Sequence, residues 1–217
     1  MIEHKDGRSN KNQELSYEIE VGVTFASFMS AATLFFTGLL LAQFKSFDPT
    51  IKVALLFLII STFTFIFSAS IYSNAGVEVT RHKFNSVQKY LSYANNIFEF
   101  LGLYLFILAT PLVIGSVTND SFLRISTILI ALIGLALYSQ SGFSILHKEL
   151  PNKQHKRVIT AAIVVLGAIM YLSQGLTQLN NFPAYDYVSG ALLILVFSVT
   201  LYFCRKSKQY IERDIQF

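Results

Sequence analysis

Long runs without a charged side chain alternate along this chain with short polar connections. A helix that crosses a hydrocarbon core about 30 Å thick needs roughly 20 predominantly apolar residues. Six segments meet or nearly meet this length, and they are apolar around the whole helix instead of on one face only. The pattern therefore predicts an all-α, polytopic integral membrane protein whose six transmembrane helices span about 21–44, 51–74, 96–118, 122–146, 157–179 and 184–204.

Three of the connections are very short and rich in turn-forming residues. Asp48 and Pro49 follow the first run, Asn119 to Ser121 follow the third, and Pro183 separates the fifth from the sixth. Two helices joined by so short a link must run antiparallel. We therefore expect three antiparallel hairpins, with Asp48 and Ser121 as N-caps of the second and fourth helices.

The basic residues are sorted by connection. Of the 17 Lys and Arg residues, fourteen fall in the N-terminal segment, the second and fourth connections and the C-terminal segment, and only Lys45, Lys52 and Arg124 fall on the other side. Lys and Arg are retained on the cytoplasmic side of a membrane. This bias predicts a polar cytoplasmic tail at 1–20, a basic cytoplasmic tail at 205–217 and a six-helix domain at 21–204 between them.

Composition narrows the class of protein further. Hydrophobic residues make up 53% of the 217 positions and charged residues only 14%, which is far from a soluble domain. The net charge of +4 comes without a block of basic residues, so we expect no nucleic-acid partner. Abundant Phe, Ile, Ser and Asn favour a prokaryotic cytoplasmic membrane.

One polar stripe leads into the third helix. Gln88, Ser92, Asn95 and Glu99 fall on one side of a helix drawn at about 100° per residue. Charged groups at membrane depth are costly and are the first candidates for function. Glu99 and Asn95 are therefore candidates for lining a vestibule for a cation or a polar solute near the cytoplasmic interface. In the alternative interpretation, Glu99 pairs with a basic residue in segment 81–83 and only fixes the helix.

Two further features have both a functional and a structural interpretation. Pro111 lies inside the third helix and is expected to kink it, either opening a binding site or being accommodated by neighbouring helices. The cytoplasmic connections also carry exposed cations that could hold an acidic protein or an anionic lipid. These basic residues are Arg81, Lys83, Lys153, Lys156 and Arg157.

Catalytic and cofactor motifs are missing from the sequence. It contains no Gly-rich phosphate loop, no nucleophile elbow and no HExxH pair, and all four histidines lie outside the predicted spans. A single cysteine excludes an internal disulfide. We expect no cofactor, no metal site and no catalytic residues, and we lean against an enzyme.

Two functional classes remain. In the first, the chain is a channel or transporter for a small ion or polar solute, with a path that includes Glu99. Such a protein could work as a homo-oligomer. In the second, it is a membrane-embedded scaffold, effector or accessory subunit that binds a cytoplasmic partner through its basic loops. We favour the first class, although the scarcity of buried charge argues against proton or sodium coupling.

Overall fold

The computed structural model describes residues 6–81, 83–141, 153–180 and 184–214, and every regular element in these ranges is helical. The third span of the sequence is one uninterrupted rod made of three consecutive elements, the middle one a π-helix. The elements are α1 (Asp6–Ala42), a 3₁₀ turn η1 (Phe44–Ser46), α2 (Ile51–Thr80), α3 (Phe84–Asn96), the π-helix η2 (Ile97–Tyr104), α4 (Leu105–Val117), α5 (Ser121–Ser141), α6 (Lys153–Asn180) and α7 (Ala184–Asp214).

Six helical segments of the described chain are long and apolar enough to cross a membrane, which confirms the number predicted from the sequence. Because these segments fold as helix, most of their backbone polar groups are hydrogen-bonded within the same segment, which is compatible with a lipid environment. The segments are Gln13–Ala42, Ile51–Thr80, Phe84–Val117, Ser121–Tyr138, Arg157–Gln178 and Ala184–Lys208.

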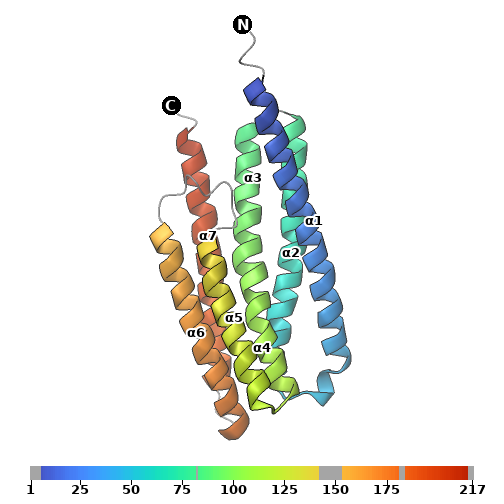
Figure 1. Ribbon diagram of the computed structural model, residues 1–217, viewed down its shortest axis with the longest axis vertical. Helices are drawn as coiled ribbons and strands as arrows, with labels where there is room; N and C mark the ends of the chain where they lie inside the picture. The colour runs from blue at the N-terminus through green and yellow to red at the C-terminus, as the bar shows by residue number, and fades with distance from the viewer. Residues whose placement is uncertain (1–5, 82, 142–152, 181–183, 215–217) are drawn as a thin grey trace.

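The α3–η2–α4 rod is the central element of the bundle (Figure 1). α2 packs against all three of its parts and carries α1 on its other side, while α5 and α6 pack against α4, and α7 packs against α3 and η2. The start of α1 and the end of α7 lie at the same end of the molecule (Figure 1). We call this the termini end, and the end that holds η1 and the α4–α5 connection the opposite end.

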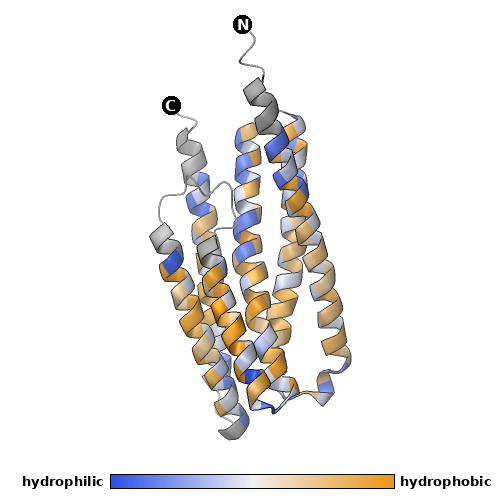
Figure 2. Cartoon of the chain, viewed as in Figure 1, coloured by the Kyte–Doolittle hydropathy of each residue, from blue (hydrophilic) through white to orange (hydrophobic). Residues whose placement is uncertain are grey.

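Several helices are longer than the predicted spans. α1 begins at Asp6 within the segment expected as a polar tail, α2 continues to Thr80, and α7 continues to Asp214 within the expected C-terminal tail. Helical hydrogen bonding does not need apolar side chains, so a helix continues beyond the point where its hydrophobic run ends. Hydrophilic residues gather near the termini end in Figure 2, most clearly along α3. The predicted end of the fourth helix at 146 lies outside the described residues.

The short turns have the predicted location but not the predicted caps. Thr50 precedes the first residue of α2, and the Asp48 carboxylate accepts the Thr50 backbone N–H at 2.9 Å. The Asp120 carboxylate, in place of the Ser121 hydroxyl, accepts the Leu123 N–H at 2.9 Å at the start of α5. A carboxylate at that position satisfies one of the free N–H groups of the first turn, so the cap lies one residue earlier than expected.

Large apolar side chains cover both the interior and the outer surface of the bundle. The interior holds Phe57, Phe100, Leu108 and Leu135, all at most 1% exposed, whereas Phe122 on the outer surface is 77% exposed. In water such an exposed surface would aggregate. In a bilayer it is the expected lipid-facing surface, and the same outer surface includes Phe28, Phe35, Ile130, Leu172 and Ile194.

Candidate functional site

Glu99 lies in the interior of the bundle. Its side chain belongs to the π-helix η2, is 4% exposed and accepts a hydrogen bond from the Tyr104 hydroxyl at 3.3 Å. A π-helix closes its hydrogen bonds between residues five apart, and such segments are frequent at functional sites. In an α-helix, residues five apart lie on different faces. The wider turn of the π-helix instead brings Tyr104 close to Glu99.

The depth of Glu99 follows from helix geometry. At a rise of about 1.5 Å per residue, Glu99 lies roughly 27 Å along the rod from Val117, the end of the span at the opposite end. A hydrocarbon core is about 30 Å thick. If the core begins at Val117, the carboxylate lies near the other boundary, inside the protein, at the interfacial depth predicted from the sequence.

Glu99 is surrounded by phenol groups from three helices. Tyr104 also shares a hydrogen bond of 3.2 Å with the Thr160 hydroxyl on α6, and its ring makes an edge contact with Tyr138 on α5, with centroids 6.2 Å apart. Tyr138 and Tyr72 on α2 both interact electrostatically with the Glu99 carboxylate. The group predicted to line a vestibule therefore lies among hydroxyl groups in the interior of the bundle.

Asn95 joins this region to α1 and α2. Its side-chain oxygen accepts a hydrogen bond from the Tyr72 hydroxyl, and its side chain is also hydrogen-bonded to Glu18 on α1. One helical turn of the rod thus carries Asn95 and Glu99 into a network that includes a second carboxylate. Neither Glu18 nor Tyr72 was predicted, because both lie on other helices and only the packing brings them to Asn95.

Ser68 adds a hydroxyl group at the same level. α2 runs antiparallel to the rod: its Phe65 contacts Gly102, and its Tyr72 is hydrogen-bonded to Asn95. Ser68 lies between Phe65 and Tyr72 on the same face of α2. This register therefore places Ser68 at the level of Glu99. The Ser68 side chain is 0% exposed, and its hydroxyl has no hydrogen-bond partner among the described residues. An unpartnered buried hydroxyl is costly, and its presence beside a buried carboxylate calls for an explanation.

The outer half of the predicted stripe behaves differently. Gln88 and Ser92 are half-buried, and their side chains make no hydrogen bond with any residue of the described ranges. The structure therefore brings Asn95 and Glu99 together in a network and leaves Gln88 and Ser92 along α3 toward the termini end. Asn96, which the stripe omitted, is 2% exposed and donates to the Ser207 hydroxyl on α7 at 3.3 Å.

In the alternative interpretation Glu99 pairs with a basic residue of segment 81–83, but these basic residues lie next to another carboxylate. Arg81 lies 3.2 Å and Lys83 4.0 Å from the carboxylate of Glu78, in the last turn of α2. Both cations are about three-fifths exposed. Arg157 is also exposed, whereas the side chains of Lys153 and Lys156, in the first turn of α6, lie outside the described part of the structure. His82 is likewise outside it.

Pro111 does not interrupt the rod, and α4 continues through it to Val117. A proline deprives the preceding turn of a backbone donor. In that turn the Tyr171 hydroxyl of α6 donates to the Leu108 carbonyl oxygen at 3.0 Å. This contact joins α6 to the rod beside Pro111, but the carbonyl that loses its helical donor to the proline is that of Ile107; the kink itself stays a prediction.

The opposite end of the bundle is closed by an amide network. The side-chain nitrogen of Gln174, which is 5% exposed, donates to the Thr50 hydroxyl at 3.2 Å, the Ser116 hydroxyl at 3.2 Å and the Leu112 carbonyl at 3.1 Å. The buried Tyr185 hydroxyl donates to the Thr50 carbonyl at 3.0 Å. These contacts join α2, α4, α6 and α7 about as far from Glu99 as the membrane is thick.

The arrangement defines a chemistry. A buried carboxylate with hydroxyl groups around it can hold a proton or a small cation, because hydroxyl and carboxylate oxygens are hard donors. The half-buried Asn95, Ser92 and Gln88 extend from it toward the termini end, and the Gln174 network closes the opposite end. No known protein family matches this chain, and neither a curated protein nor a solved structure is significantly similar to it, so the assignment of function depends on this geometry alone.

Proposed function

We propose that this protein is a transporter or channel that moves a small cation or polar solute across a membrane, with Glu99 as the binding carboxylate. The observation that supports the proposal is the burial of Glu99 against the Tyr104 hydroxyl of its own π-helix, which in turn bonds the Thr160 hydroxyl of α6. An ionisable group retained inside a membrane bundle is costly, and such groups generally mark ion or substrate pathways. This burial also weakens the argument from the sequence against ion coupling.

The two ends of the bundle favour a gated transporter over a permanently open pore. From Glu99 toward the termini end the rod offers the half-buried polar groups of Asn95, Ser92 and Gln88. Toward the opposite end the buried hydroxyls of Ser61, Thr62 and Thr64 are bonded to carbonyls of their own helix, and the buried Gln174 amide nitrogen is hydrogen-bonded to three acceptors. In this proposal the site is reached from the termini side, and release on the other side requires the network to open.

The proposal includes the orientation and the setting. The six spans form three antiparallel hairpins in a prokaryotic cytoplasmic membrane, with both termini in the cytoplasm, as the sorting of Lys and Arg favours. The apolar outer surfaces of α1 and α5 are free to contact lipid or a second copy of the chain. Homo-oligomerisation is therefore compatible with a path inside each subunit.

The test is ion flux into liposomes that contain the purified protein. Proton, Na⁺ and K⁺ gradients are imposed in turn, and uptake is followed with a pH-sensitive or cation-sensitive dye. Glu99→Gln is expected to lower flux by at least about tenfold, the effect of losing one charge-assisted contact of about 1.4 kcal/mol. Glu20→Gln is the matched control, because Glu20 is an exposed carboxylate on α1.

Ser68→Ala separates a pathway role from a structural one. Removing a buried hydroxyl that has no described partner should leave stability unchanged or improve it. If Ser68 contributes an oxygen to the transported species, the same variant lowers flux. Wild-type protein that conducts none of these ions would contradict transport of a cation, and Glu99→Gln and Ser68→Ala variants that fold and conduct like wild type would contradict the role of Glu99.

The second candidate function is a scaffold that binds an acidic cytoplasmic partner. It is favoured by the exposure of Arg81, Lys83 and Arg157 at the termini end. Positive charge on cytoplasmic connections is expected of any membrane protein, so this observation carries less weight than a buried carboxylate. Absence of flux from correctly folded liposome-embedded protein would favour this second candidate.

A further inference from the structure

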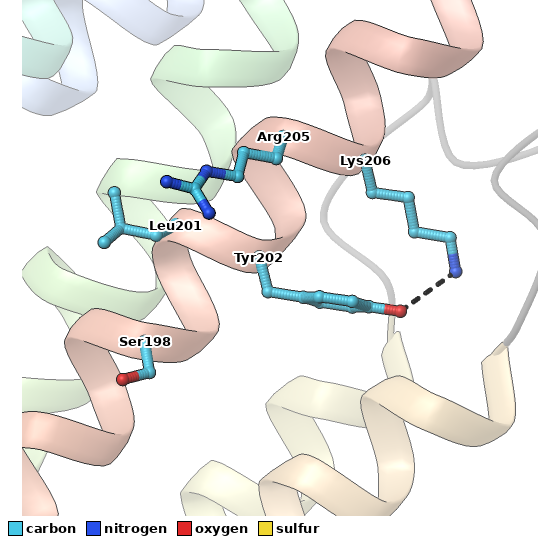
Figure 3. Close-up of a pocket in the computed structure, with 5 residues that line it drawn as sticks. All are labelled: Ser198, Leu201, Tyr202, Arg205 and Lys206. Atoms are coloured by element: carbon cyan, nitrogen blue, oxygen red, sulfur yellow. Dashed lines mark hydrogen bonds between the residues drawn. The ribbon is translucent and has the colours of Figure 1, made fainter.

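A groove on the outer surface of α7 combines basic, phenolic and apolar side chains near the termini end (Figure 3). It encloses about 510 Å³, within the usual range for a small-molecule site. In Figure 3, Arg205 extends to one side of α7 and the Tyr202–Lys206 pair extends to the other. The lining residues are Ser198, Leu201, Tyr202, Arg205 and Lys206.

The charge in this groove is uncompensated. Arg205 is exposed and has no ion pair or hydrogen bond with any residue of the described ranges. Lys206 donates to the Tyr202 hydroxyl at 3.3 Å and lies 5.5 Å from the centre of the Tyr202 ring. Between Asp186 and Glu212 the sequence of α7 contains no acidic residue. The groove therefore presents two cations to whatever occupies it.

The depth of the groove places these cations at a membrane boundary. Arg205 lies roughly 31 Å along α7 from Ala184, about the thickness of a hydrocarbon core. One to three turns deeper, Leu201, Phe197 and Ile194 are 57%, 41% and 70% exposed on the outer surface. Cationic and phenolic groups thus lie at the headgroup level, directly above an apolar surface at the depth of acyl chains.

We propose that this groove binds the headgroup of an anionic phospholipid, whose acyl chains lie along Leu201, Phe197 and Ile194. Arg205, on one side of α7, offers a guanidinium suited to bidentate contacts with the lipid phosphate, and Lys206, on the other side, adds a second cation for the headgroup. The Ser198 and Tyr202 hydroxyls are further hydrogen-bonding groups in the same groove. Basic groups between or beside transmembrane helices on the cytoplasmic side are suited to anionic headgroups.

Charge complementarity favours a lipid over a second copy of the chain. A two-fold contact through this face would bring Arg205 and Lys206 against the same residues of the other subunit, and like charges opposed at an interface disfavour association. An acidic soluble protein could match the cations, but it would leave the apolar surface below them to lipid. An anionic phospholipid satisfies both levels of the groove at once.

The experiment measures lipid retention by native mass spectrometry. Full-length protein in detergent is mixed with equal amounts of dioleoyl phosphatidylglycerol and dioleoyl phosphatidylcholine. We expect wild-type protein to retain the anionic lipid about thirtyfold more than the zwitterionic one, as two cations near the surface imply. Arg205→Gln/Lys206→Gln should abolish most of this preference. Lys45→Gln/Lys52→Gln, which removes the same charge from exposed positions at the opposite end, should keep it.

Two further measurements keep the test decisive. Glycerol 1-phosphate, which has the charge but no acyl chains, should give no stable adduct; if it binds as well as the lipid, the groove is an anion site and the lipid proposal is wrong. If the double variant does not fold, Arg205→Gln and Lys206→Gln are measured singly, each with an expected loss of about fivefold. A wild-type protein without preference for the anionic lipid, or a control variant that loses it equally, overturns the proposal.

Discussion

Gln174 on α6 fills the space beside Gly115 on α4. A Cβ atom at Gly115 would lie 2.7 Å from the side-chain oxygen of Gln174 and 3.1 Å from its side-chain carbon and nitrogen. The same amide nitrogen makes three hydrogen bonds that close the opposite end of the bundle. The absence of a side chain at position 115 is thus what allows α4 and α6 to approach closely enough for this network to form.

Gly115→Ala should therefore destabilise the protein. The added methyl group must displace a buried amide whose hydrogen bonds hold it in place, and overpacking of this kind costs about 1–3 kcal/mol. The measurement is thermal unfolding of the purified protein in detergent. Gly134→Ala is the matched control, because a Cβ atom at Gly134 meets nothing within 4 Å. Equal unfolding temperatures for the two variants would contradict the close contact.

Arg124 depends on the shape of its guanidinium as well as on its charge. It donates to the Gly115 carbonyl at 2.5 Å, the Thr118 carbonyl at 2.6 Å, the Gln178 side-chain oxygen at 3.0 Å and the Asn119 side-chain oxygen at 3.1 Å. Lysine keeps the charge but cannot reach four separate acceptors. Arg124→Lys should lower the free energy of unfolding by about 1–3 kcal/mol, and Arg124→Ala by more.

The check on Arg124 is chemical or thermal unfolding of the three proteins under one detergent condition. The expected order of stability is wild type, then Arg124→Lys, then Arg124→Ala. A Lys variant as stable as wild type would mean that charge alone matters there. Membrane orientation should be unaffected, because removal of a positive charge from the less basic side only strengthens the existing bias.

Asp48 lies between the first two spans, and we expect protonation of its carboxylate to lower the free energy of unfolding in acid. Burial raises the pKa of its carboxyl group, but the backbone and hydroxyl of Thr50, the amide of Gln178 and the charge of Arg124 together lower the pKa below its usual value of 3.8. A carboxylate with a lowered pKa stabilises the folded state above the unfolded pKa, and this contribution is lost as the pH falls through the folded pKa.

The unfolding temperature should therefore fall more steeply for wild type than for Asp48→Asn as the pH is lowered from about 5 toward 2. Asparagine keeps an oxygen that can accept the Thr50 N–H but does not titrate. At neutral pH wild type should be the more stable of the two. Parallel acid profiles for the two proteins would show that Asp48 contributes nothing to this pH dependence.

The number of spanning segments could be predicted from sequence because it depends on local composition. Each apolar run must be long enough to cross the hydrocarbon core, and a charge inside a run is costly wherever the helix packs. The ends were less predictable. Helical geometry continues through polar residues, so the hydropathy boundary at residue 21 does not coincide with the start of α1 at Asp6.

The partners of Glu99 could not be predicted, because they depend on local helix geometry and on how the helices pack. A stripe drawn at about 100° per residue assumes an α-helix throughout, but Ile97–Tyr104 is a π-helix, which brings Tyr104 to Glu99 across five residues. Tyr72, which bonds Asn95, and Thr160, which bonds Tyr104, come from helices whose rotation about their own axes is set by packing. One feature of the sequence could have indicated these contacts: Tyr72 and Tyr104 lie within predicted spans, whereas tyrosine is more common at the ends of spans.

The predicted orientation can be tested with single cysteines. In a Cys204→Ser background, Asp120→Cys and Lys208→Cys place one thiol at the opposite end and one at the termini end, both at exposed positions. Fourteen of the 17 basic residues lie in segments assigned to the termini end, so a membrane-impermeant maleimide applied to intact cells should label position 120 and spare position 208. Permeabilised cells should be labelled at both. Labelling of both positions in intact cells, or of position 208 alone, would contradict the orientation, because retained positive charge keeps the termini end in the cytoplasm, where the reagent cannot reach it.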